Sequence, residues 1–103
     1  MKVALVQINS VVGDIEGNTK KIISIIRKTK ADVVVFPELS ITGYSPHDLL
    51  LKHDFIDENM DALKEIAQNT RNKVAVVGFI EKAYKNLYNS AAIIRNQQIV
   101  EIH

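Results

Sequence analysis

The sequence predicts an α/β fold with the element order β-α-β-α-α-β-β-β. Three observations support it: short apolar runs typical of buried strands, longer segments with apolar residues at helical spacing, and connecting loops that contain glycine or proline. Because a helix of about a dozen residues separates the first two strands, these strands should be parallel. With 103 residues, the chain has the size of one small domain or of part of a larger one.

The first half of the chain is expected to form a strand, a helix and a second strand. Residues 2–8 (KVALVQI) are mostly apolar, as in a strand covered on both faces. A glycine-containing loop follows, and Asn18 is expected to cap a helix over residues 19–30, whose isoleucines share one face. Residues 31–36 (ADVVVF) predict a second buried strand, which Pro37 ends because proline has no N–H to donate.

Two helices and a third strand are predicted next. A short helix is expected over residues 48–52, and apolar spacing predicts a longer helix over residues 54–70. Residues 73–80 (KVAVVGFI) should form the third strand. Gly78 inside this strand indicates a bulge or a close approach of another backbone segment.

The last part of the chain predicts a hairpin. After a polar connection over residues 81–86, two strands are expected over residues 87–95 and 99–102, joined by a tight turn at residues 96–98. Helices on only one face of such a sheet would leave a large apolar patch exposed. We therefore expect further sequence or a partner chain, such as a second copy in a homo-oligomer, to cover the second face.

The composition excludes several classes of function. The net charge of +1 gives no electrostatic basis for binding nucleic acid or an anionic membrane. The absence of cysteine excludes a disulfide framework, a thiolate zinc site and a cysteine nucleophile in this chain. His47, His53 and His103 lack metal-ligand spacing, so no metal site is expected. No apolar run approaches the ~20 residues of a membrane span and no signal segment opens the chain, so a cytoplasmic location is expected.

The loop over residues 37–46 (PELSITGYSP) carries the candidate site, because α/β proteins place their chemistry at the carboxyl ends of strands. Glu38 directly follows a buried strand, and a partly desolvated carboxylate there suits a general base; a loop-bracing or helix-capping role is the alternative. Gly43 allows a positive φ for a sharp turn. Tyr44 then places an amphipathic ring over the sheet edge, for packing or for ligand contact.

The run VVVFPELSITGY, the opening KVALVQINSVVGDIEGN and the later LYNSAAII together resemble the carbon–nitrogen hydrolase, or nitrilase, superfamily. The segments GDIEGN and GYSPHDLLL look like one branch of it, the N-terminal glutamine amidotransferase domain of glutamine-dependent NAD+ synthetases. The resemblance covers residues 1–103. It implies an incomplete carbon–nitrogen hydrolase domain, the N-terminal third to half of an α-β-β-α sandwich of two facing sheets.

The resemblance also implies a Glu-Lys-Cys catalytic set. In this set a cysteine attacks the amide carbon, a glutamate takes and returns protons, and a lysine stabilises the tetrahedral oxyanion. Glu38 matches the glutamate of the family, and Tyr44 matches the tyrosine that lines the glutamine pocket in the synthetase branch. The family implies no cofactor in this domain; a second domain would use ATP to amidate the NAD+ precursor with the released ammonia.

The chain departs from the family pattern because neither the lysine nor the cysteine is among its 103 residues. In the family, the lysine lies in an Arg-Lys pair after the strand that here ends near His103, and the cysteine lies further on. We therefore expect a fragment of a glutamine-hydrolysing enzyme that is inactive alone. The alternatives are a non-catalytic remnant that acts as an oligomerisation module, and a plain amidase or nitrilase, against which Asp48-Leu49-Leu50 argues.

Overall fold

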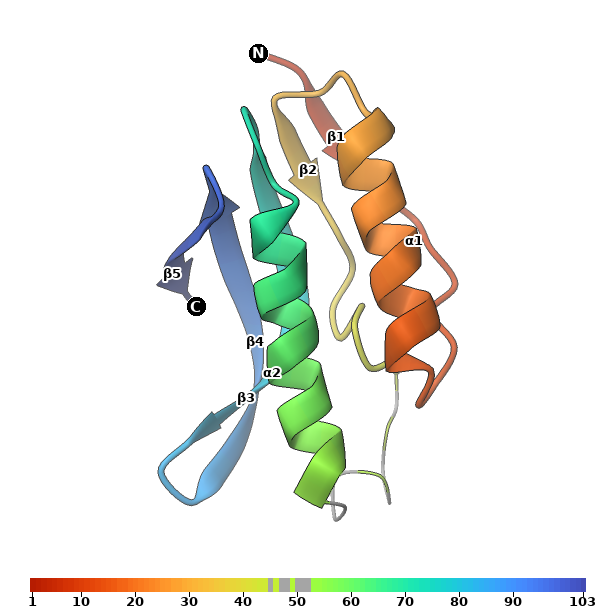
Figure 1. Ribbon diagram of the computed structural model, residues 1–103, viewed down its shortest axis with the longest axis vertical. Helices are drawn as coiled ribbons and strands as arrows, with labels where there is room; N and C mark the ends of the chain where they lie inside the picture. Colours follow the sequence, from red (N-terminus) through yellow and green to blue (C-terminus); the bar gives the residue numbers. More distant parts are fainter. Residues whose placement is uncertain (45, 47–48, 50–52) are drawn as a thin grey trace.

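The computed structural model describes residues 1–44, 46, 49 and 53–103, and within them a five-stranded sheet carries two helices (Figure 1). The elements are β1 (Val3–Leu5), α1 (Ile15–Lys28), β2 (Val33–Val35), α2 (His53–Gln68), β3 (Val74–Ala83), β4 (Asn86–Arg95) and β5 (Gln98–Ile102). In space the strands follow the order β1-β2-β3-β4-β5; the first three are parallel and the last three antiparallel. The predicted α/β class and the parallel first pair are confirmed. The short helix expected over residues 48–52 lies outside the described residues, except for Leu49.

The β3–β4 hairpin is longer than the sequence predicts. Residues 81–83, expected in a polar connection, continue β3, and only Tyr84 and Lys85 separate it from β4. The two strands pair along their full length of ten residues each, from Val74 opposite Arg95 to Ala83 opposite Asn86. Cross-strand pairing thus outweighs the polar composition of this segment.

The β4–β5 hairpin confirms the predicted pair of strands, with a turn one residue shorter than expected. Asn96 and Gln97 form the turn, and both have positive φ angles, 48° and 66°. Two successive positive φ values define the type I′ turn, whose twist matches that of paired strands. A two-residue turn fixes the register of β4 and β5 at their ends.

Helix α1 begins four residues earlier than predicted, and Asn18 is not its cap. Asp14 caps the helix instead, because its side chain accepts a hydrogen bond from the Gly17 N–H at 3.0 Å. Asn18 lies inside the helix and is fully buried. Its Nδ2 donates to the carbonyl oxygens of Val11 and Ile41, each at 2.8 Å, and its Oδ1 accepts from the Val11 N–H at 2.8 Å. Asn18 therefore fastens the loop before α1 to the loop after β2.

We expect Asn18→Ala to lower the free energy of unfolding by about 3 kcal/mol, because the Val11 N–H and the buried Ile41 carbonyl oxygen lose their hydrogen-bond partner. A denaturant titration of the chain followed by circular dichroism measures this. Lys20→Ala is the matched control on the same helix, since its 3.1 Å ion pair with Glu16 is exposed and should contribute less than about 1 kcal/mol. Equal losses in the two variants would contradict the bracing role of Asn18.

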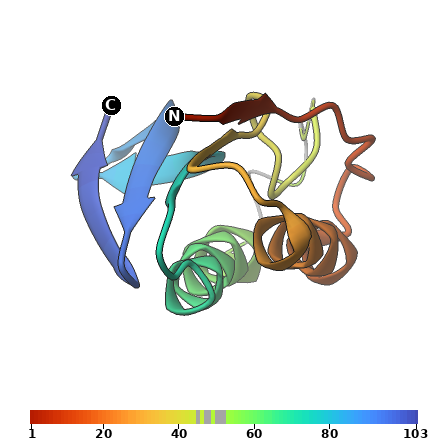
Figure 2. The same cartoon turned by 90° about the horizontal axis from the view of Figure 1, so that it is seen from above.

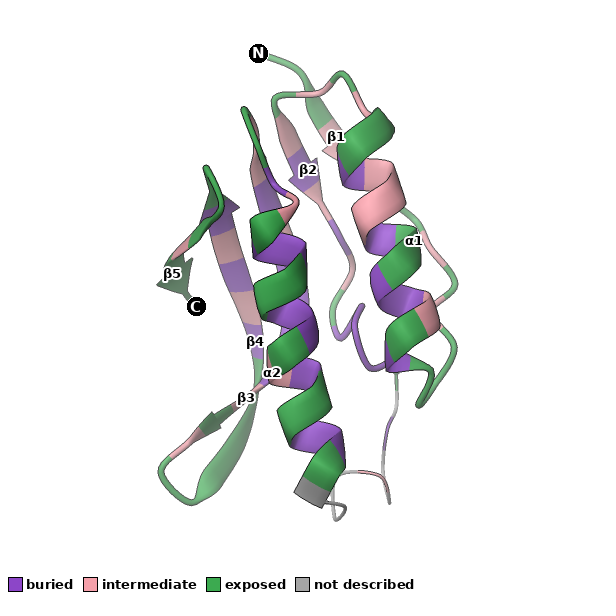
Figure 3. Cartoon of the chain, in the orientation of Figure 1, coloured by how far each residue is buried: buried purple, intermediate pink, exposed green. Residues whose placement is uncertain are grey.

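Both helices cover the same face of the sheet, and the core lies between the helices and this face (Figure 2). The side of each helix that faces the sheet is buried and the outer side is exposed (Figure 3). The largest fully buried apolar side chains of the helices and inner strands are Ile22, Ile26, Leu63, Ile66, Val34, Val77, Phe79 and Ile94. None of the described helices is long and apolar enough to cross a membrane.

The opposite face of the sheet is covered by no described helix. We call it the open face; strand register and alternation place on it Val3, Leu5, Val33, Val35, Val74, Val76, Gly78, Ile80, Asn89, Ala91 and Ile93. On this face Val3 is 56% exposed and Leu5 is 78% exposed. The described residues thus do not cover both faces of strand β1, in contrast to the expectation from its apolar sequence.

Candidate active site

The candidate site lies just beyond the end of β2. Here β3 continues, but β2 no longer pairs with it. The last residue of β2, Val35, pairs with Val76, and the Phe36 N–H still donates to the Val76 carbonyl at 2.9 Å. Further along β3, a side chain from α2 replaces the missing strand. Asn59 donates to the Ile80 carbonyl oxygen at 2.6 Å and accepts from the Ile80 N–H at 3.2 Å. The backbone of β3 is therefore satisfied while space opens for the loop that follows β2.

That loop crosses the open face directly over Gly78. A Cβ atom built on Gly78 would lie 2.6 Å from the Leu39 nitrogen, 2.6 Å from the Pro37 oxygen and 3.0 Å from the Glu38 carbonyl carbon. All three are backbone atoms, so only glycine leaves room for this path. The predicted close backbone approach at Gly78 is confirmed, and it sets the height of Glu38 above the sheet.

The loop then turns sharply through two residues with positive φ. Leu39 has φ 50°, which is uncommon for a bulky residue, and Gly43 has φ 80°. The Gly43 N–H donates to the Leu39 carbonyl at 2.8 Å and closes the turn. The predicted positive φ at Gly43 is confirmed. Backbone strain such as that at Leu39 is concentrated at functional sites, and here it lies directly after Glu38.

The two predicted site residues lie at one hollow. Glu38 and Tyr44 both line a hollow of about 220 Å³ at the carboxyl end of β2. Its other lining residues are Ile8, Asn9, Ser10, Pro37, Leu39 and Ser40. Tyr44 is 75% exposed, so within this chain its ring does not pack into the core. The phenol is thus available to contact a ligand or another segment of protein.

Glu38 is exposed, which differs from the partial desolvation expected after a buried strand. The reason is its position on the open face, where no described element covers it. Its Oε1 accepts a hydrogen bond from Nδ2 of Asn89, a residue of β4 that is 51 positions later in the chain. Sequence reasoning did not single out Asn89. The signal that could have found it is the strand register, which places Asn89 opposite Ile80 and beside the loop.

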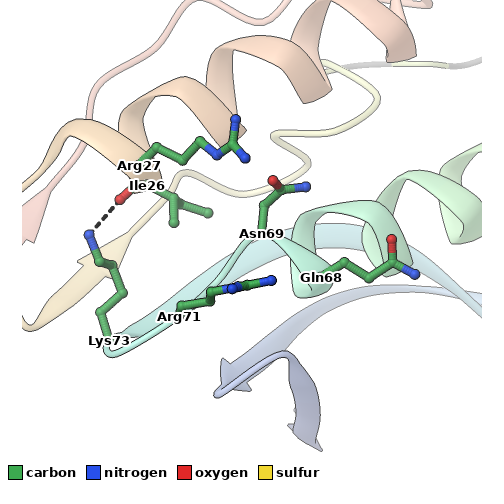
Figure 4. Close-up of a pocket in the computed structure, with 6 residues that line it drawn as sticks. All are labelled: Ile26, Arg27, Gln68, Asn69, Arg71 and Lys73. Atoms are coloured by element: carbon green, nitrogen blue, oxygen red, sulfur yellow. Dashed lines mark hydrogen bonds between the residues drawn. The ribbon is translucent and has the colours of Figure 1, made fainter.

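A larger hollow of about 360 Å³ lies near the C-terminal ends of α1 and α2 and the start of β3 (Figure 4). It contains neither predicted site residue. It is lined by Ile26, Arg27, Gln68, Asn69, Arg71 and Lys73. Lys73 Nζ donates to the carbonyl oxygens of Ile26 at 2.6 Å and Thr29 at 2.9 Å, at the end of α1. Cations at a helix C-terminus balance the partial negative charge of its free carbonyls, so Lys73 has a structural role here.

The remaining sequence-based expectations about the site concern histidines and the Asp-Leu-Leu motif. His47 and most of residues 48–50 lie outside the described residues. His53 is the first residue of α2, and His103 follows β5. Among the described residues, the candidate site thus consists of Glu38, Tyr44 at the same hollow, and Asn89, which is hydrogen-bonded to Glu38.

Comparison with known protein families gives one match across the chain. The carbon-nitrogen hydrolase family matches residues 2–103. A glutamine-dependent NAD(+) synthetase from Thermotoga maritima is 39% identical over 108 residues, which covers 100% of this chain and 19% of the relative. The corresponding protein of Xanthomonas campestris is 41% identical over 103 residues, covering 96% of this chain and 19% of the relative. The chain thus spans about a fifth of the length of these relatives.

Solved structures show the same fold. A glutamine-dependent NAD(+) synthetase from Cytophaga hutchinsonii matches 99% of this chain with 18% of its own, at a TM-score of 0.93 and 24% identity. The synthetase of Acinetobacter baumannii in complex with ADP matches 99% of this chain with 20% of its own, at 0.89 and 34% identity. An amidase from Nesterenkonia sp. matches 99% of this chain with 41% of its own, at 0.83 and 18% identity. The predicted relationship to the nitrilase-like fold is confirmed.

Proposed function

Because the chain belongs to the carbon–nitrogen hydrolase family, we propose that it supplies part of the glutamine-hydrolysing site of a glutamine-dependent NAD+ synthetase. The observation that carries the proposal is the position of Glu38, at the carboxyl end of a central strand and at one hollow with Tyr44. The sequence similarity to NAD(+) synthetases from several bacteria supports the substrate assignment. Residues 1–103 then form the N-terminal part of a carbon–nitrogen hydrolase domain.

The proposed chemistry assigns a separate task to each side chain. The Glu38 carboxylate accepts the proton of the nucleophile and returns it to the departing ammonia. The ring of Tyr44 lines the pocket for the glutamine side chain, with its hydroxyl available as a hydrogen-bond partner. The sequence contains no cysteine, so the nucleophile has to come from residues beyond these 103. We assign the oxyanion-stabilising lysine to the same further residues, because the family pattern places it after the strand that here ends near His103. This hydrolysis requires no cofactor in the domain.

The proposed partner of this site is a synthetase domain that uses ATP and receives the ammonia. The complex of the Acinetobacter baumannii relative with ADP supports a nucleotide-binding partner domain. The open face, with Val3 and Leu5 exposed, supports burial against further protein of the same assembly, and a homo-oligomer is one such arrangement. A cytoplasmic location is proposed together with this function.

We expect the 103-residue chain by itself to release no ammonia from glutamine, because a general base without a nucleophile cannot form the covalent intermediate. A coupled assay for ammonia with the purified chain measures this. Ammonia release above background that disappears in Glu38→Gln would contradict this expectation and would mean that the chain carries its own nucleophile.

The decisive test of the proposed function begins with the source gene across codon 103. We expect the reading frame to continue into an Arg-Lys pair and, further on, a cysteine, and the full gene product to hydrolyse glutamine. A stop codon together with a homogeneous oligomer would instead favour a non-catalytic oligomerisation module, for which the exposed Val3 and Leu5 are the supporting observation. Preference for simple aliphatic amides over glutamine would favour a plain amidase.

A further inference from the structure

We propose that Asn89 is a positioning residue that holds the carboxylate of Glu38 in its reactive orientation. The observation is the hydrogen bond from Asn89 Nδ2 to Glu38 Oε1 on the open face. It joins the loop after β2 to a strand on the far side of β3. This inference rests on the proposed role of Glu38 as a general base.

The backbone of Asn89 is paired within the sheet, which makes this residue suitable as an anchor. It lies within β4, opposite Ile80 of β3, and its neighbour two positions on, Ala91, lies opposite Gly78. The loop that carries Glu38 crosses directly over Gly78, so the same register places Asn89 beside the carboxylate. The paired hairpin fixes the position of the donor much better than a second loop residue would.

The chemistry of an asparagine suits this task. Its NH2 group is a neutral donor, so it orients a carboxylate without supplying a proton at working pH. With Oε1 held by Asn89, Oε2 remains free to exchange the proton with the nucleophile and the leaving group. A lysine or arginine in this place would instead form an ion pair and favour the ionised carboxylate strongly, which hinders the uptake of the proton from the nucleophile.

The test compares Asn89→Ala and Asn89→Asp in the full-length gene product with glutamine as the substrate. We expect kcat to fall about 10-fold in Asn89→Ala and about 100-fold in Asn89→Asp, with KM little changed, because misorientation of a reacting group is costly. Asp has the shape of Asn but lacks the donor and places a second carboxylate against Glu38. If Asn89 only filled space, Asp would be the milder of the two substitutions.

Ser90→Ala is the matched control, because Ser90 also donates to a carboxylate, Glu81 at 2.8 Å, but on the helix-covered face of the same strand. It should keep wild-type kcat. Synthetase activity with added ammonia bypasses the glutamine site and should remain normal in all variants that fold.

Three results would overturn the inference: unchanged kcat in both Asn89 variants, a milder effect of Asp than of Ala, or a change in KM alone. The proposed function fails separately, when Glu38→Gln itself retains glutamine hydrolysis. A loss of activity in Glu38→Gln together with wild-type kcat in the Asn89 variants therefore rejects only the role of Asn89.

Discussion

Replacing Glu38 by glutamine in the full-length gene product should lower glutamine-dependent activity by about 10³-fold or more, with ammonia-dependent activity unchanged. The glutamine side chain introduced at position 38 has nearly the same size as glutamate but cannot act as a general base. General acid–base catalysis contributes about 10²–10⁴-fold to such reactions. Glu38 is exposed and makes its hydrogen bond to Asn89 rather than to the core, so its neutral replacement should leave folding intact. Parallel assays with glutamine and with ammonium salt measure the two activities.

Glu16→Gln is the matched control for this experiment. Glu16 is another exposed glutamate, in the first turn of α1, and its only described ion pair is with Lys20. The same loss of charge there should change neither activity beyond about 2-fold, because exposed pairs contribute little. Glutamine hydrolysis that survives Glu38→Gln would reject the general base assigned here, and with it the proposed site.

Local sequence patterns predicted the parts of the fold that depend on neighbouring residues. The apolar runs placed β2 and β3, helical spacing placed α2, and proline and glycine placed the loop of Glu38 and its sharp turn at Gly43. Gly78 was predictable as a point of close approach, because a glycine weakens a strand interior and is typical of places where another backbone segment needs the room. The position of Glu38 directly after a buried strand made it a candidate base, and the resemblance to the family favoured this role over a loop-bracing one.

The features that were missed depend on contacts between distant segments. Asparagine is a preferred residue type at helix N-caps, yet Asp14 caps α1. Asn18 instead forms hydrogen bonds with backbone groups of Val11 and Ile41, in two separate loops. Glu81 and Lys82 are polar, yet pairing with β4 keeps them in the strand. Asn89 reaches Glu38 only through the register of the hairpin, which no local pattern specifies.

Gly78→Ala is the second substitution for which we expect a large effect. It should destabilise the protein, whereas glycine-to-alanine changes at most strand positions stabilise it. Replacing glycine by alanine at an ordinary strand position stabilises a protein by reducing the freedom of the unfolded chain. At Gly78 the new Cβ would approach the Leu39 nitrogen and the Pro37 oxygen to 2.6 Å. Both are backbone atoms, so the whole loop has to lift away from β3. We expect a loss of about 2 kcal/mol in the free energy of unfolding, typical of overpacking.

The same displacement should lower glutamine-dependent kcat by about 100-fold, because a shift of about 1 Å in a reacting group has effects of this size. Gly17→Ala is the matched control, since the atoms nearest to its new Cβ belong to the side chain of Asp14. Rotation of Asp14 gives up its hydrogen bond with the Gly17 N–H, a loss of about 1 kcal/mol that the better helix propensity of alanine offsets by a similar amount. This control should leave activity unchanged and stability nearly so. Denaturant unfolding and steady-state kinetics of both variants separate the two effects. If Gly78→Ala kept wild-type kcat, the position of Glu38 would not depend on contact of its loop with β3, and the strand-anchored geometry argued for this site would be wrong.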